Sequence, residues 1–100
     1  MEDKLKTFCF DLDGTLCSTK NGDYLSTIPF LDRIKRVNAL HDKGHRILIY
    51  TARGMATGFD YRILTERQLQ KWGLEYDKLI MDKPEADVYV DDRALNIKDW

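Results

Sequence analysis

The sequence predicts an α/β fold with a mainly parallel sheet flanked by helices. Short apolar runs of strand length alternate with longer segments in which apolar residues recur every three or four positions, as on one face of a helix. One run, residues 47–50, is continuously apolar, which is typical of a strand in a parallel sheet covered on both faces. Strands that alternate with helices favour right-handed crossovers between parallel neighbours.

The first strand is expected over residues 7–12, an apolar and aromatic run that ends at Gly14. Residues 14–27 are polar and predict a loop or small hairpin, with Asn21 and Gly22 as the turn. A helix should follow, in which Thr27 caps the first turn, Pro29 lies in that turn and Gly44 marks the end.

After the strand within residues 46–53, the loop 54–60 leads into a second predicted helix over 60–72. Gly73 suits the left-handed position that ends many helices. Tyr61, Leu64 and Trp72 are expected on one face of this helix, with Leu69 beside it, as its core-facing side.

Two further strands are expected near the end of the chain, over residues 78–81 and 87–90, before a last helical turn in residues 94–100. One hundred residues are enough for a single domain, which we expect to span 1–100.

Composition limits the partners and the cellular location that we expect for the protein. The net charge of −1 gives no reason to expect nucleic acid or an acidic membrane as a partner. No apolar stretch approaches the ~20 residues of a membrane span, and the N-terminus lacks a signal-peptide core. Cys9 and Cys17 have no metal-type spacing and are expected to be free thiols. These features predict a cytoplasmic protein.

Polar residues follow several of the expected strands at the point where each strand ends. The carboxyl ends of parallel strands meet at one edge of a sheet, and ligands bind outside that edge. We therefore expect residues from distant parts of the chain to converge there, namely Asp11, Asp13, Thr51, Arg53, Lys83, Asp91 and Asp92.

Several carboxylates at one edge require positive charge to remain ionised together. Lys83 supplies one unit, and Mg²⁺, which prefers oxygen ligands, would supply more. Such a site with the Thr51 hydroxyl matches a phosphoryl group. Asp11 could attack phosphorus, and Asp13 could protonate the leaving oxygen and later activate water.

Four motifs in order carry a resemblance to a known family. The segments are DLDGT at residues 11–15, LIYTAR at 48–53, and KPEADVYVDD at 83–92, which holds the last two motifs. They resemble the signature of the haloacid dehalogenase (HAD) superfamily of phosphatases over nearly the whole chain. The resemblance implies a minimal Rossmann-like core, here without a cap domain because the intervals between motifs leave no room for one.

The resemblance also implies roles for individual residues. Asp11 would be the nucleophile and a ligand of Mg²⁺, and Asp13 the general acid and base whose carbonyl also binds the metal. Thr51 and Lys83 would hold the phosphoryl group, Asp91 would bind the metal, and Asp92 would orient a metal-bound water. Substrate contacts are expected from Gly14, Thr15, Ala52, Arg53 and Arg93.

A finer similarity links the chain to bacterial phosphatases of capsule and surface-polysaccharide biosynthesis. It suggests a small phosphorylated substrate, such as a sugar phosphate, whose recognition residues lie in 15–27 and 53–60. An open, capless site could be covered by another copy of the chain in a homo-oligomer. Two alternatives use the same kind of intermediate: a phosphotransferase or mutase, and a receiver-like phospho-acceptor signalling domain. A non-catalytic interaction module with the same fold is a third.

Overall fold

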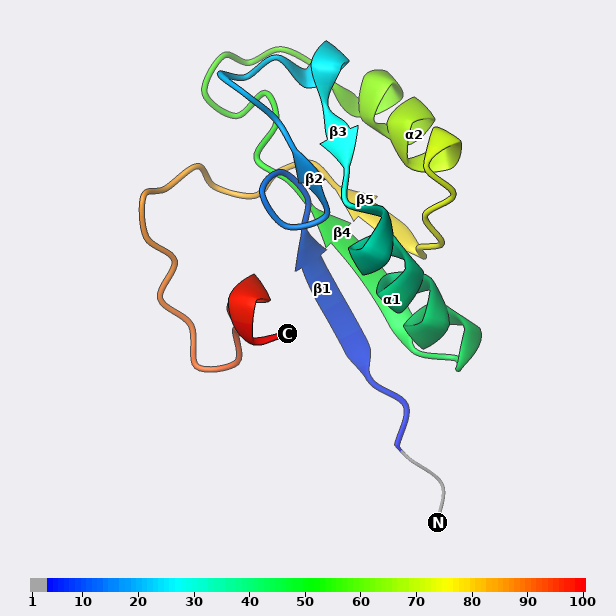
Figure 1. The fold of residues 1–100 in the computed structure, drawn as a ribbon. Helices are drawn as coiled ribbons and strands as arrows, with labels where there is room; N and C mark the ends of the chain where they lie inside the picture. The colour runs from blue at the N-terminus through cyan, green and yellow to red at the C-terminus, as the bar shows by residue number, and fades with distance from the viewer. Residues whose placement is uncertain (1–3) are drawn as a thin grey trace.

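The computed structural model of the protein describes residues 4–100 and contains a three-stranded parallel sheet with two helices (Figure 1). The strand order is β1-β4-β5, and a two-stranded antiparallel ribbon, β2-β3, lies above it. The α/β class and the parallel sheet are thus confirmed, and the arrangement is compatible with a Rossmann-like core. The elements are β1 (Thr7–Asp11), β2 (Cys17–Ser18), β3 (Ile28–Pro29), α1 (Leu31–Asp42), β4 (Arg46–Tyr50), α2 (Arg62–Lys71) and β5 (Lys78–Ile80).

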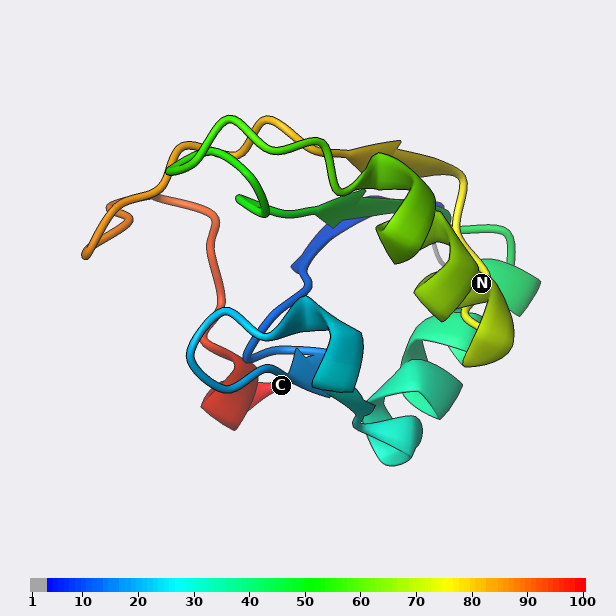
Figure 2. The same cartoon turned by 90° about the horizontal axis from the view of Figure 1, so that it is seen from above.

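Both helices cover the same face of the sheet (Figure 2). Ile34 and Val37 of α1 and Leu69 of α2 are buried in one cluster with Ile47 and Ile49 of β4. The order β1-β4-β5 explains this, because two right-handed crossovers that advance in the same direction place their helices on the same side.

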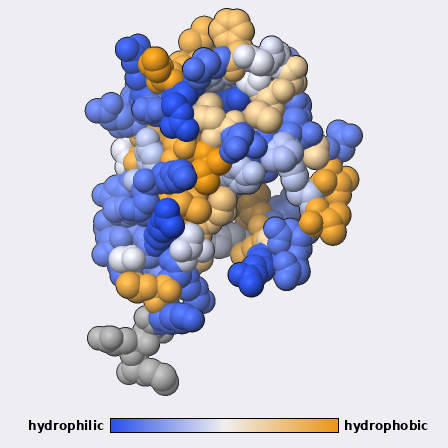
Figure 3. Space-filling view, turned by 180° about the vertical axis from the view of Figure 1, so that it is seen from behind, coloured by the Kyte–Doolittle hydropathy of each residue, from blue (hydrophilic) through white to orange (hydrophobic). Residues whose placement is uncertain are grey.

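The opposite face of the sheet is not covered by any helix among residues 4–100, so the expectation of two covered faces was wrong. Leu48, Tyr50 and Ile80 are half-buried there, and Cys9 is exposed. Figure 3 shows this side of the molecule, where hydrophobic side chains gather between polar ones. Neither cysteine forms a disulfide, as expected.

The first helix begins later than its sequence suggests. Helix α1 starts at Leu31, with Phe30 at the cap position and no side-chain cap bond. Pro29 belongs instead to β3, which pairs with β2. The Thr27 hydroxyl, expected as a cap, lies 2.8 Å from the Thr19 hydroxyl across the ribbon. The ribbon thus competes for the residues that would have formed the first turn.

The second helix ends as predicted, and of the residues expected on its core-facing side Leu69 is the one that is fully buried. The amide of Gly73, at a φ of 72°, donates to the Gln70 carbonyl at 3.1 Å, and that of Leu74 donates to Leu69 at 3.0 Å, which completes the capping motif. Thr65 and Leu69 are the fully buried residues of α2. Tyr61 precedes the helix, and Trp72 is only partly buried against the core.

The predicted strand over residues 87–90 does not form. The chain leaves the sheet after β5, and the side chains of Val88 and Val90 are 74% and 94% exposed. Tyr89 bonds locally to the Pro84 carbonyl and the Ala86 amide, which curls this segment on itself. A strand needs a partner edge as well as β-forming residues, and this segment meets none.

The last residues return to the core after this excursion. A 3₁₀ turn at Ile97–Asp99 confirms the expected last helical turn. The Trp100 ring then packs edge-on against Phe10, with the centroids 5.1 Å apart, and lies 3.9 Å from the Arg36 guanidinium. Within residues 4–100, no helix combines the length and apolar character needed to cross a membrane.

Two substitutions in α2 test which side of the helix supports the fold. Leu69→Ala should lower the free energy of unfolding by about 2–5 kcal/mol, because Leu69 is fully buried and its loss leaves a cavity. Ile63→Ala is the matched control, since Ile63 is 67% exposed and should change stability by less than about 0.5 kcal/mol. Urea denaturation followed by circular dichroism measures both. Equal losses would contradict this packing.

Candidate active site

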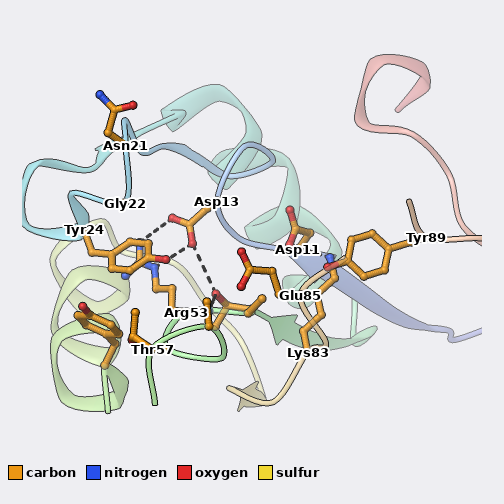
Figure 4. A pocket seen from close by; sticks show the side chains of 15 residues that line it. Asp11, Asp13, Asn21, Gly22, Tyr24, Arg53, Thr57, Lys83, Glu85 and Tyr89 are labelled. Atoms are coloured by element: carbon orange, nitrogen blue, oxygen red, sulfur yellow. Dashed lines mark hydrogen bonds and ion pairs between the residues drawn. The ribbon is translucent and has the colours of Figure 1, made fainter. Parts of the chain in front are cut away.

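A pocket of about 480 Å³ lies beyond the carboxyl ends of the three strands (Figure 4). Its wall comes from the turn after β1, the loop that joins β2 to β3, the loop after β4 and the segment after β5. Acidic, basic and phenolic side chains meet there: Asp11, Asp13, Glu85, Arg53, Lys83, Tyr24, Tyr61 and Tyr89. The predicted convergence at one sheet edge is confirmed for Asp11, Asp13, Thr51, Arg53 and Lys83.

Asp11 stands at the end of β1 with one cation and one hydroxyl against it. The Lys83 ammonium donates to Oδ1 at 2.9 Å, and the Thr15 hydroxyl donates to Oδ2 at 3.0 Å. Thr15 reaches back because the chain turns sharply at Gly14, where φ is +86°. The Asp11 side chain is still 35% exposed toward the pocket, so its carboxylate can meet a ligand.

Asp13 forms a two-pronged ion pair with Arg53. Its Oδ2 accepts from Nε of Arg53 and its Oδ1 from Nη2, both at 2.9 Å, and the Thr19 hydroxyl donates to Oδ1 at 2.6 Å. Burial alone would raise the pKa of Asp13, but the hydrogen bonds and charge of Arg53, with the Thr19 bond, hold it below its ordinary value. Asp13 is therefore ionised at neutral pH.

Arg53 has no guanidinium nitrogen left for a substrate. Its side chain is fully buried. Beyond Asp13, its Nη1 donates to Thr65 at 3.1 Å and to Gln68 at 2.6 Å, and its Nη2 approaches Thr27 at 3.5 Å. The expectation that Arg53 binds substrate is thus corrected, because every donor already has a protein partner. Arg53 holds the site together.

Thr51 and Lys83 sit side by side at the ends of neighbouring strands. The Lys83 amide donates to the Thr51 carbonyl at 3.2 Å, which extends the pairing of β4 and β5 into the pocket. The Lys83 ammonium lies 4.2 Å from the centre of the Tyr89 ring.

The loop after β4 requires glycine at position 54. A Cβ added to Gly54 would stand 2.0 Å from the Phe59 carbonyl oxygen.

Other predicted site residues are not brought to the pocket. Asp91, Asp92 and Arg93 are exposed and do not line it, because the segment 87–90 does not join the sheet. The Asp91 carboxylate instead accepts from the Arg93 amide at 2.7 Å. Of the remaining predicted contacts, Ala52 lines the pocket, whereas Gly14 and Thr15 shape the turn beneath Asp11.

The pocket matches Mg²⁺ in donor chemistry but does not assemble a complete ligand set. Asp11, Asp13 and Glu85 offer carboxylate oxygens, the ligands that Mg²⁺ prefers. Among residues 4–100, however, the one close group of three metal-ligating side chains is found elsewhere, at His41, Asp42 and Glu75. Asp11 and Asp13 are each balanced by a basic side chain instead.

The group at His41 lies at the other end of the sheet. The two imidazole nitrogens are 3.4 Å from Glu75 and 3.6 Å from Asp77, and the adjacent Asp42 raises the pKa of Glu75. These contacts connect the end of α1 to the segment before β5.

Thiol chemistry does not fit the pocket. Cys17 contacts Asp13 through Sγ at 3.5 Å, but burial and the Asp13 charge raise its pKa to about 12. The thiol therefore stays protonated at neutral pH and is a poor nucleophile.

Several pocket residues were not predicted individually. Asn21 and Gly22 were expected as a turn, and they line the pocket with Tyr24 inside the segment expected to recognise substrate. Tyr89 was missed because residues 87–90 were expected to run as a strand, and Glu85 lies just before that segment. Nothing in the helical pattern of α2 distinguishes Gln68, which contacts Arg53.

A solved structure from Vibrio cholerae, an MCSG target, resembles this chain closely. The two are 31% identical, the match covers 94% of this chain and 85% of that one, and the TM-score is 0.85. The protein described here therefore belongs to the same family as the Vibrio cholerae protein. The relationship shows a shared family and a shared fold, and it carries no activity to this chain.

A chain in a structure of the Pnkp1/Rnl/Hen1 complex is also similar, with 26% identity and a TM-score of 0.61. The match covers 88% of this chain but 30% of that one, so the fold corresponds to one part of a larger chain. No protein-family model matches the sequence, and no curated protein matches it significantly.

The Asp13–Arg53 pair should make stability depend on pH in the acidic range. A carboxyl whose pKa is lowered by folding stabilises the fold above its unfolded value of 3.8, and this stabilisation is lost as pH falls through the lower folded value. Asp13→Asn should therefore flatten the fall in unfolding free energy below about pH 4. Urea titrations at several pH values measure this, with the exposed Asp32→Asn as the control. An unchanged acid profile in Asp13→Asn would contradict the assignment.

Proposed function

We propose that the protein is a capless HAD-type phosphatase that hydrolyses a small phosphate monoester through an aspartyl-phosphate. The observation that carries this proposal is the meeting of Asp11, Thr51 and Lys83, from the ends of three strands, in one pocket beside an ionised Asp13. A carboxylate nucleophile, a cationic phosphate ligand and a second carboxylate are the groups that this reaction needs.

In the first step, an Asp11 oxygen attacks phosphorus. A bond forms between that oxygen and phosphorus, and the ester bond breaks with its electron pair on the leaving oxygen. Lys83 is placed to neutralise phosphate charge, because its ammonium lies 2.9 Å from the Asp11 carboxylate. Thr51 lines the same wall, and its hydroxyl, which lies 3.5 Å from Asp13, would turn from that long contact to donate to a phosphate oxygen. The leaving oxygen then takes up a proton from solvent water, because Asp13 is ionised.

In the second step, water attacks the phosphorus of the aspartyl-phosphate and regenerates Asp11. Asp13 suits the role of base, since Arg53 and Thr19 keep it ionised and fixed in place. The ionised carboxylate of Asp13 can accept a proton from water, as the expected role of general base requires. To act as an acid, Asp13 would first have to take a proton, against the effect of Arg53.

Mg²⁺ is the cofactor that we propose for this pocket. Asp11 and the carbonyl of Asp13 would hold it, and Glu85 is a further carboxylate in the pocket wall. When bound, the ion would neutralise charge on the phosphoryl group. Metal dependence is therefore a direct test of the proposal, independent of which further acid completes the site.

The proposed substrates are small phosphorylated metabolites, such as sugar phosphates used in bacterial capsule or surface polysaccharides. The pocket volume of about 480 Å³ falls in the usual range of small-molecule sites. Phosphate release from a panel of sugar, polyol, amino-alcohol and nucleoside phosphates, with Mg²⁺ and with EDTA, tests this. Mg²⁺-dependent release concentrated on sugar phosphates is expected. Release that EDTA leaves unchanged would contradict the metal proposal.

Asp11→Asn should lower turnover roughly 10³-fold or more while leaving the fold intact, because an amide cannot serve as the nucleophile. Steady-state phosphate release measures the loss, and circular dichroism checks the fold. Asp32→Asn, an exposed acid of α1, is the control and should retain full activity. Near-normal turnover by Asp11→Asn, with deamidation excluded by mass spectrometry, would remove Asp11 from this role.

A further inference from the structure

The side chain of Gln68 bridges two parts of the pocket that are far apart in the sequence. Its amide oxygen accepts from Nη1 of Arg53 at 2.6 Å, and its amide nitrogen donates to the main-chain carbonyl of Tyr24 at 2.5 Å. Gln68 itself belongs to α2, outside the pocket wall. One side chain therefore links the guanidinium of Arg53 to the main chain of Tyr24.

The flap, defined here as residues 19–27, forms one wall of the pocket through Asn21, Gly22 and Tyr24. The Tyr24 ring lies 4.6 Å from the Arg53 guanidinium and packs edge-on against Tyr61 at 4.8 Å. Figure 4 shows Tyr24 and Arg53 close together beside Asp13. The position of this wall thus depends on the same arginine that holds Asp13.

Other bonds hold the two ends of the flap but not its middle. Thr19 donates to Asp13 and Thr27 lies 3.5 Å from Arg53, so both ends are fixed near the arginine. Between them, the short 3₁₀ turn at Tyr24–Ser26 has no side-chain cap bond. Apart from the packing of the Tyr24 ring, the hydrogen bond from Gln68 is the one hydrogen bond among the described residues that reaches this turn from another element.

We propose that Gln68 is a positioning residue that sets the flap and Arg53 relative to each other, so that substrate binding and the placement of Asp13 are linked. For its kinetic part this inference rests on the proposed phosphatase function. The role requires an amide, because only Asn and Gln carry a strong acceptor and a strong donor on one planar group. The proposal therefore predicts that the two bonds can be separated by substitution.

Gln68→Glu and Gln68→Met separate them. Glutamate still accepts from Arg53 but has no donor for the Tyr24 carbonyl, whereas methionine can make neither bond well. Gln68→Glu should raise KM roughly fivefold and leave kcat within about twofold, since losing one hydrogen bond costs about 1 kcal/mol. Gln68→Met should also lower kcat roughly tenfold, because Arg53 loses a partner. Gln70→Glu, an exposed neighbour in α2, is the control.

A second measurement does not depend on activity. Lys20 is exposed in the flap, so cleavage by trypsin after Lys20 in the folded protein reports how firmly the flap is held. Both Gln68 variants should be cut there several-fold faster than the wild type, with no change in Gln70→Glu. Mass spectrometry identifies the site, and circular dichroism confirms that each variant is folded.

The outcomes distinguish this inference from the proposed function. Unchanged cleavage after Lys20 in folded Gln68→Glu and Gln68→Met would overturn the link to the flap, whatever the enzyme does. Equal effects of both variants on KM and kcat would overturn the separation of roles. If the wild type hydrolyses no phosphate monoester but cleavage after Lys20 rises as expected, the phosphatase proposal fails and the structural link stands.

Discussion

The ion pair between Arg53 and Asp13 is the interaction on which the site depends. A fully buried guanidinium is stable only when its charge is paired and its N–H groups are satisfied. Arg53 meets this demand with partners from the turn after β1, the flap and α2. Removing either partner of the pair would leave the other without its counter-charge, which destabilises a fold more than losing the pair altogether.

The sheet topology makes this interaction possible. Parallel strands bring Asp11, Thr51 and Lys83 to one edge although they are far apart in the sequence. Two crossovers in the same direction place α1 and α2 on one face, which brings Thr65 and Gln68 of α2 within reach of Arg53. Among residues 4–100, the same arrangement leaves the second face without a helix, so one face of the sheet carries the core and the pocket lies at its edge.

The meeting of Asp11, Asp13, Thr51 and Lys83 could be predicted from the sequence, since apolar runs mark strands and strand ends share an edge. The run over residues 87–90 has the composition of a strand, yet composition cannot say whether an edge is available. Asp91 and Asp92 were misplaced for that reason. Likewise, Thr27 has the residue type of a helix cap but bonds across the β2-β3 ribbon. The position of Gln68 depends on how α2 packs, which no local pattern records.

The most direct test of the account is the stereochemical course of hydrolysis at phosphorus. The substrate would carry a chiral, isotopically labelled thiophosphate group, and the reaction would run in labelled water. Attack by Asp11 followed by attack of water is two in-line displacements, each of which inverts phosphorus, so the account predicts net retention. Net inversion would mean that water attacks the substrate directly, which would contradict an aspartyl-phosphate on Asp11.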